Sequence, residues 1–88
     1  MKLKSGVIVT EANGEYVAIA AGEAGKSFNG MIKMNETAAF IAKTLENEMD
    51  VDSVVDAVCG EYDVDSNTAR ENVMMIIEKL SSIGLIEK

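Results

Sequence analysis

Apolar residues open the chain in two short runs whose composition predicts paired β-strands. Val7–Ala12 is rich in β-branched residues, and Glu15–Ala21 is a second run with Tyr16, Val17 and Ile19. The pair Asn13-Gly14 separates them. Asn-Gly is the strongest short signal for a two-residue hairpin, because both central residues of a type I′ turn need a positive φ. Such a turn fixes the register between the strands, so Ile8 should face Ile19. We expect the core side of this hairpin to carry Ile8, Val17 and Ile19.

A third apolar run covers Phe28–Met34, and the spacing of the apolar residues changes directly after it. Beyond it the apolar positions recur every three or four residues, which is typical of a helix with one buried face. Asn35 stands at the N-cap position, where its side-chain oxygen can accept from the free N–H groups that open a helix. We expect a third antiparallel strand at or near the sheet edge. It leads into a helix over about Glu36–Glu48 that buries Ala38, Ile41, Ala42, Leu45 and Met49.

The same periodicity predicts two further helices. Asp50 is placed to cap the first of them and Asp65 to cap the second. Gly84 ends the last helix, because glycine readily adopts the left-handed conformation that closes helices. The two apolar stripes are Val51, Val54, Val55, Val58, Cys59 and Tyr62, then Ala69, Val73, Ile76, Ile77, Leu80 and Ile83. We therefore expect one α+β domain over residues 1–88, with a three-stranded antiparallel sheet followed by three helices.

Composition restricts the kinds of site that the chain can build. Its 88 residues include one cysteine and no histidine, so neither an internal disulfide nor a zinc site of soft ligands can be assembled. No apolar run approaches the roughly 18–20 residues that cross a bilayer. The N-terminus also lacks the apolar segment of a signal peptide. We therefore expect a cytoplasmic protein with no membrane partner, no metal and no other cofactor.

Charge restricts the partners further. Fifteen acidic against eight basic side chains give a net charge of −7, which would repel a phosphate backbone, so no nucleic-acid partner is expected. Acidic residues concentrate around the second helix, at Glu46, Glu48, Asp50, Asp52 and Asp56. They form either a solvated face or a surface that docks a basic patch on a partner.

Three segments carry a resemblance to a known family. They are the strand-to-helix segment Phe28–Phe40, the junction Glu61–Asp65 and the ending Leu80–Ile86. Together they resemble the coenzyme PQQ synthesis protein D (PqqD) family, also called the RiPP recognition element. The most specific motif is Met34-Asn35-Glu36-Thr37 at the entry to the first helix, and the similarity covers nearly the whole chain. Ala42 departs from the family, whose members often carry a bulky aromatic residue near this point.

The resemblance implies a non-catalytic peptide chaperone with a winged-helix-like fold. In the family, the leader of a precursor peptide adds to the third strand in a cleft beside the third helix. The domain then presents the precursor to a modifying enzyme, commonly a radical SAM protein, in the synthesis of pyrroloquinoline quinone or a related peptide product. Carried onto this chain, the peptide-binding residues are Met31, Ile32, Lys33 and Met34 from the strand, with Arg70, Val73, Met74 and Ile77 from the helix.

Other interpretations of the same residues stay open. Arg70 could simply pair with Glu71 or Asp65, and an unpaired edge strand could join a second copy of the chain. Asp52-Ser53-Val54 resembles the attachment site of acyl carrier proteins, which would make Ser53 a prosthetic-group anchor, although carrier proteins lack a hairpin. A winged-helix DNA-binding domain is a further alternative, opposed by the acidic charge.

Overall fold

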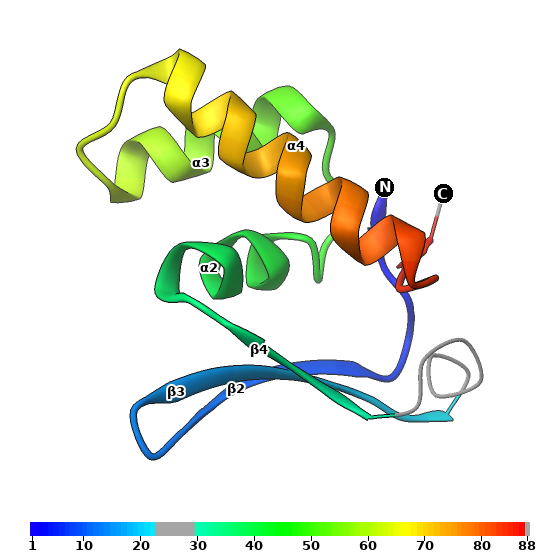
Figure 1. The fold of residues 1–88 in the computed structure, drawn as a ribbon. Helices are drawn as coiled ribbons and strands as arrows, with labels where there is room; N and C mark the ends of the chain where they lie inside the picture. Colours follow the sequence, from blue (N-terminus) through cyan, green and yellow to red (C-terminus); the bar gives the residue numbers. More distant parts are fainter. Residues whose placement is uncertain (23–29, 88) are drawn as a thin grey trace.

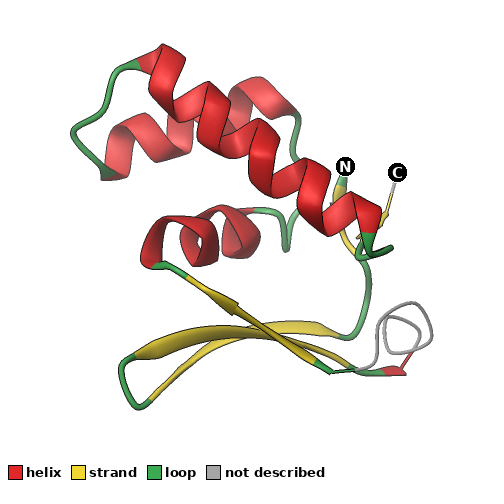
Figure 2. Cartoon of the chain, in the orientation of Figure 1, coloured by secondary structure: helices red, strands yellow, loops and turns green. Residues whose placement is uncertain are grey.

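The computed structural model describes residues 1–22 and 30–87, and it confirms an α+β fold in which a three-stranded sheet precedes three helices (Figures 1 and 2). The strands are β1 (Lys2–Leu3), β2 (Val7–Ala12), β3 (Glu15–Ala20), β4 (Met31–Met34) and β5 (Ile86–Glu87). The helices are α2 (Glu36–Thr44), α3 (Val51–Glu61) and α4 (Ser66–Ser82). Within the described ranges, no helix is long and apolar enough to span a membrane.

The main sheet has the strand order β2-β3-β4 and is antiparallel throughout. Asn13 and Gly14 both have positive φ, of 55° and 79°, as a type I′ turn requires. Ile8 pairs with Ile19, so the predicted register is confirmed. The beginning of the predicted third strand, at Phe28, lies outside the described residues.

The prediction of which hairpin face turns inward is wrong. The inner face carries Val9 and Ala18, which are 6% and 1% exposed, whereas Ile8 is 54% exposed on the outer face. Ile19 shares that outer face, and so does Val17, which is buried in the middle strand without joining the main core cluster. Both faces of the hairpin are apolar in sequence, so alternation alone does not distinguish them. The helices pack on the face that carries Val9 and Ala18, and Val7, Tyr16 and Ala20 of the same face lie against the core.

A second, very short sheet joins the two ends of the chain and has no counterpart in the predicted elements. Lys2 pairs with Glu87 and Leu3 with Ile86, and the side chains of Leu3 and Ile86 are buried. The Leu3 amide also donates to the Leu45 carbonyl at 2.8 Å, which attaches this sheet to the end of α2. Two-residue strands are too short to produce a periodic signal in a sequence.

Each helix begins at the predicted cap. The side chains of Asn35, Asp50 and Asp65 accept from backbone amides three residues further on, at 2.8, 2.7 and 2.7 Å. Gly84 has a φ of 78° and ends α4, as expected. Helix α2 is shorter than predicted, because the chain turns at Leu45 to meet the N-terminal strand.

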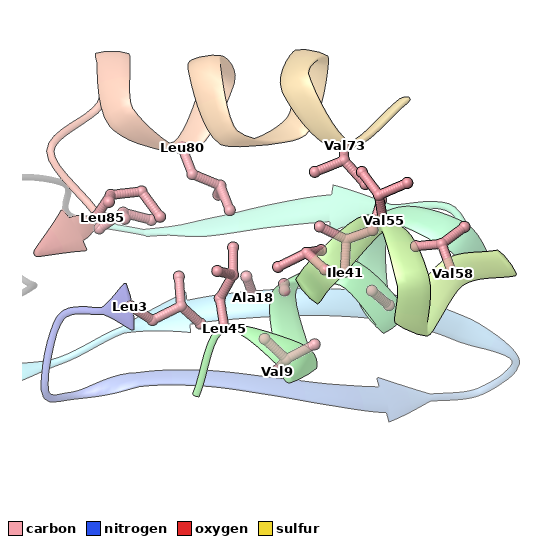
Figure 3. Close-up of a cluster of buried hydrophobic side chains, with 14 of the residues drawn as sticks. Leu3, Val9, Ala18, Ile41, Leu45, Val55, Val58, Val73, Leu80 and Leu85 are labelled. Carbon is pink, nitrogen blue, oxygen red and sulfur yellow. The ribbon is translucent and has the colours of Figure 1, made fainter. Parts of the chain in front are cut away.

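Helix α2 lies between the sheet and the other two helices, so its side chains fill the centre of the molecule (Figures 1 and 3). Ile41 and Leu45 are fully buried, and Val55, Val73 and Leu80 close the core from α3 and α4. The core therefore depends on one helix that contacts both layers.

The revised face assignment can be tested with two neighbouring substitutions. Val9→Ala should lower the free energy of unfolding by about 1.5–3 kcal/mol, since it empties a packed position. Ile8→Ala should change it by about 0.5 kcal/mol or less, as expected for an exposed site. Urea denaturation measures both values. A larger loss for Ile8→Ala than for Val9→Ala would contradict the assignment.

Candidate functional site

Strand β4 leaves one backbone edge open. Among the described strands it pairs with β3 alone. Gly30 accepts a hydrogen bond from β3 at 3.4 Å, and antiparallel pairs alternate between bonded and non-bonded positions, so the next bonded residues are Ile32 and Met34. The backbone N–H and C=O groups of Met31 and Lys33 therefore face the open edge.

A groove runs beside this edge, between β4 and α4. One hollow of about 220 Å³ is lined by Ile32, Met34, Ala38, Ile76, Lys79 and Leu80, together with Lys33 and Asn35. A second hollow of about 170 Å³ shares Asn35, Ala38 and Ile76 and extends to Asn72 and Met75. We call the two hollows together the β4 groove. Each is comparable with an apolar cavity of about 150 Å³ that holds a benzene ring, so each can accept one large apolar side chain.

The β4 groove combines apolar side chains with amides, a hydroxyl and two lysines. Seven of its twelve lining residues are apolar, and the other five are Lys33, Asn35, Thr37, Asn72 and Lys79, with no carboxylate among them. The side chain of Lys33 forms an exposed ion pair with Glu15 at 3.7 Å. Within residues 1–22 and 30–87, no group of three or more histidine, cysteine, aspartate or glutamate residues could hold a metal ion. The groove can thus pair with an extended backbone and bury alternate side chains.

Contacts between α2 and the end of α3 lie next to Asn35, which lines the groove. The rings of Phe40 and Tyr62 pack edge to face at a centroid distance of 5.6 Å. The Tyr62 hydroxyl donates to Glu36 at 3.2 Å, beside the Asn35 cap. Loss of surrounding water and the nearby Glu36 carboxylate raise the pKa of Tyr62, so its phenol stays a donor at neutral pH.

The structure divides the predicted site into two parts. Met31, Ile32, Lys33 and Met34 form the open strand, but the two hollows beside it are lined by other residues of α4 than the predicted ones. Val73 is fully buried in the core (Figure 3), while Met74 and Ile77 line a separate hollow with Val51 and Ile86. The structure therefore does not bring these helix residues together with β4 in the two hollows, and their part in peptide binding stays a prediction.

Arg70 lies on that other flank of α4 as well. It pairs with Asp52 of α3 at 2.7 Å rather than with Glu71 or Asp65. A helical wheel shows that Arg70, Met74 and Ile77 lie beside the buried stripe, but it cannot show which of the two flanks faces the sheet. The crossing of α4 over α2 and α3 decides that choice.

Sequence reasoning missed the residues of α4 that do line the groove, which are Asn72, Met75, Ile76, Lys79 and Leu80. Their spacing of three and four residues places them on one flank of the helix. Met75 is 61% exposed, an unusual position for a large apolar side chain. That exposure leaves an apolar side chain accessible on this flank of α4.

Amide hydrogen exchange tests the assignment of the open edge. The amides of Ile32 and Met34 donate into the sheet, so they should exchange at least about tenfold more slowly than those of Met31 and Lys33. Residue-resolved NMR exchange on the free protein measures this alternation. Equal protection at all four positions would mean that the edge is covered.

Comparison with known proteins places this geometry in a family context. The family model for Coenzyme PQQ synthesis protein D (PqqD) matches residues 6–86. No curated protein sequence matches the chain. The solved structure "TbiB1 in Complex with the TbiA(beta) Leader Peptide" is similar, with a TM-score of 0.75 and 23% identity over 99% of this chain and 95% of that chain. The solved structure "Lasso peptide synthetase B1 complexed with the leader peptide" has a TM-score of 0.73 and 21% identity, over 99% of this chain and 96% of that chain. These similarities show the same fold.

Proposed function

Because the chain belongs to the PqqD family, we propose that it is a non-catalytic carrier that binds the leader of a ribosomally made precursor peptide. The observation that carries the proposal is the open edge of β4 beside an apolar groove. Both solved structures of similar fold are complexes with leader peptides, one of TbiB1 and one of a lasso peptide synthetase B1. The sheet at the start of the chain also separates it from helical acyl carriers, so Ser53 is not proposed as an anchor.

Strand addition would use the backbone groups that the sheet leaves free. A leader segment antiparallel to β4 would exchange about four hydrogen bonds with Met31 and Lys33. Leader residues opposite Ile32 and Met34 would then point their side chains to the inner side of the sheet, into the β4 groove. The leader should therefore carry two apolar residues separated by a single residue.

The energies show why both parts of the site are needed. Four main-chain hydrogen bonds at about 0.5–1.5 kcal/mol each supply about 2–6 kcal/mol. Micromolar binding needs about −8 kcal/mol net, after association has cost several kcal/mol more. Two buried apolar side chains add about 1.5–3 kcal/mol each. Backbone pairing gives direction and register, while the groove gives most of the remaining affinity.

The later steps follow from the family and are part of the same proposal. The carrier presents its bound precursor to a peptide-modifying enzyme, of the radical SAM class or another, and the product is pyrroloquinoline quinone or a related modified peptide. The open edge could also pair with a second copy of the chain. Such a homodimer would compete with the leader for Met31 and Lys33.

A proline at the outward-facing position of β4 tests backbone pairing. Lys33→Pro removes an amide that points away from β3, and an edge strand tolerates this change. Binding of the cognate leader, measured by isothermal titration calorimetry, should weaken at least about tenfold, or 1.4 kcal/mol. Lys33→Ala removes the same side chain but keeps the amide, so its affinity should stay close to that of the wild type. Equal affinities of the two variants would contradict strand addition.

Two adjacent methionines test which flank of α4 binds the leader. Met75→Asp places a charge at the β4 groove and should weaken leader binding at least about tenfold, since that charge would lose water in the complex. Met74→Asp adds the same charge on the other flank and should leave leader affinity unchanged. Fluorescence anisotropy with a labelled leader measures both. The reverse result would restore the original choice of helix residues.

A further inference from the structure

Helix α4 has a second apolar hollow, on the flank opposite the β4 groove. It has a volume of about 490 Å³ and is larger than either hollow beside β4. Its walls come from α4, from the beginning of α3 and from both ends of the chain, at Met1, Val51, Met74, Ile77, Ser81 and Ile86. We call it the Met74 hollow. Met74 is 45% exposed, so a large apolar side chain of the lining faces solvent.

The surroundings of the Met74 hollow are acidic. Val51 of the hollow opens α3, and Glu48, Asp50 and Asp52 stand within three residues of it in the sequence. Glu78 lines the hollow directly. Hydrogen bonds from the Ser53 backbone and side chain lower the pKa of Asp50, next to Val51, so this carboxylate is charged at neutral pH.

Two cations close to this surface are paired with two of the carboxylates near Val51 in the sequence. The N-terminal ammonium pairs with Glu48, and Arg70 pairs with Asp52 at 2.7 Å. Lys2, which acts on Glu48, and Lys79, which lies near Met74, are the other cations of this region. Against them stand Asp50 and Glu78 beside the hollow and Glu71 close by, so the rim keeps a small excess of negative charge. An apolar centre with an anionic rim is complementary to an apolar segment flanked by lysine or arginine.

We infer that the Met74 hollow docks a cationic, amphipathic segment of the enzyme that modifies the peptide. This goes beyond leader binding and rests on the proposed function only for the identity of that partner. One helix would then serve two partners at once, with the leader on the Met75 flank and the enzyme on the Met74 flank. Neither partner would have to leave before the other could bind.

A synthetic helical peptide of leucine and lysine serves as a defined probe, and its leucine–glutamate counterpart is the control. Added to the full chain labelled with ¹⁵N, the lysine peptide should shift amides around Val51, Met74 and Ile86, whereas the glutamate peptide should not. Raising the salt concentration should weaken this binding, because the attraction to the rim is screened. Shifts confined to β4, or equal binding of both peptides, would overturn the inference.

Two charge-matched variants make the test specific to the site. Met74→Lys and Met75→Lys add the same charge to the protein, but only Met74→Lys places it in the hollow. The lysine peptide should bind Met74→Lys at least about tenfold more weakly and Met75→Lys nearly as well as wild type. Equal losses would mean attraction to net charge alone and would overturn the proposal. Sedimentation gives a further check. If the wild-type protein is a dimer and Met74→Lys is a monomer, a second copy of the chain occupies the hollow, and the proposal is overturned.

Leader binding provides the independent readout. Met74→Lys should leave the affinity for the leader unchanged. Lys33→Pro should lower the affinity for the leader and leave the affinity for the lysine peptide unchanged. A failure of leader binding in wild-type protein would therefore reject the proposed function, and a failure of the peptide shifts would reject only the docking surface. Competition between the leader and the lysine peptide would show one shared site and would overturn the two-sided arrangement.

Discussion

The packing of α2 between two layers is the constraint on which the rest of the structure depends. The helix has nine residues, and isolated helices shorter than about 12–15 residues are marginal in water, so burial must stabilise it. Ala38, Ala39 and Ala42 are almost completely buried, and their small side chains let the sheet and the other helices approach closely. Ala38 also lines the β4 groove. The position of α2 therefore sets the width of the groove as well as the stability of the core.

In the proposed complex, the open edge of β4 and the groove beside it would act as one site, with separate contributions to recognition. Backbone groups at Met31 and Lys33 are the same whatever side chains a leader carries, so they fix direction and register without selecting a sequence. Selection falls to the groove, where Ile76 and the flexible Met75 can adapt to side chains of different shape. A free edge strand is a risk for association between copies, and here the strand is only four residues long.

Local signals predicted the parts of the fold that local chemistry determines. The caps at Asn35, Asp50 and Asp65 and the turn at Asn13-Gly14 each depend on a few neighbouring atoms, and each was correctly predicted. Features that depend on packing between distant elements could not be predicted from these local signals. The hairpin has apolar residues on both faces, so only packing against α2 shows that Val9 lies inside and Ile8 outside. The α4 residues beside β4 were not predicted for the same reason, because the flank of α4 that meets β4 depends on how the helices cross.

The pairing of Lys2 with Glu87 has a consequence for how this fold can be used in larger proteins. The first and last strands lie side by side, so the chain enters and leaves the domain at nearly one place (Figure 1). A domain with adjacent ends can be inserted into a surface loop of another protein with little change to either fold. Because Met1 and Ile86 also border the Met74 hollow, such a host would begin beside that surface. The recognition strand would remain free on the far side of α4, so carrier and host could evolve as one polypeptide.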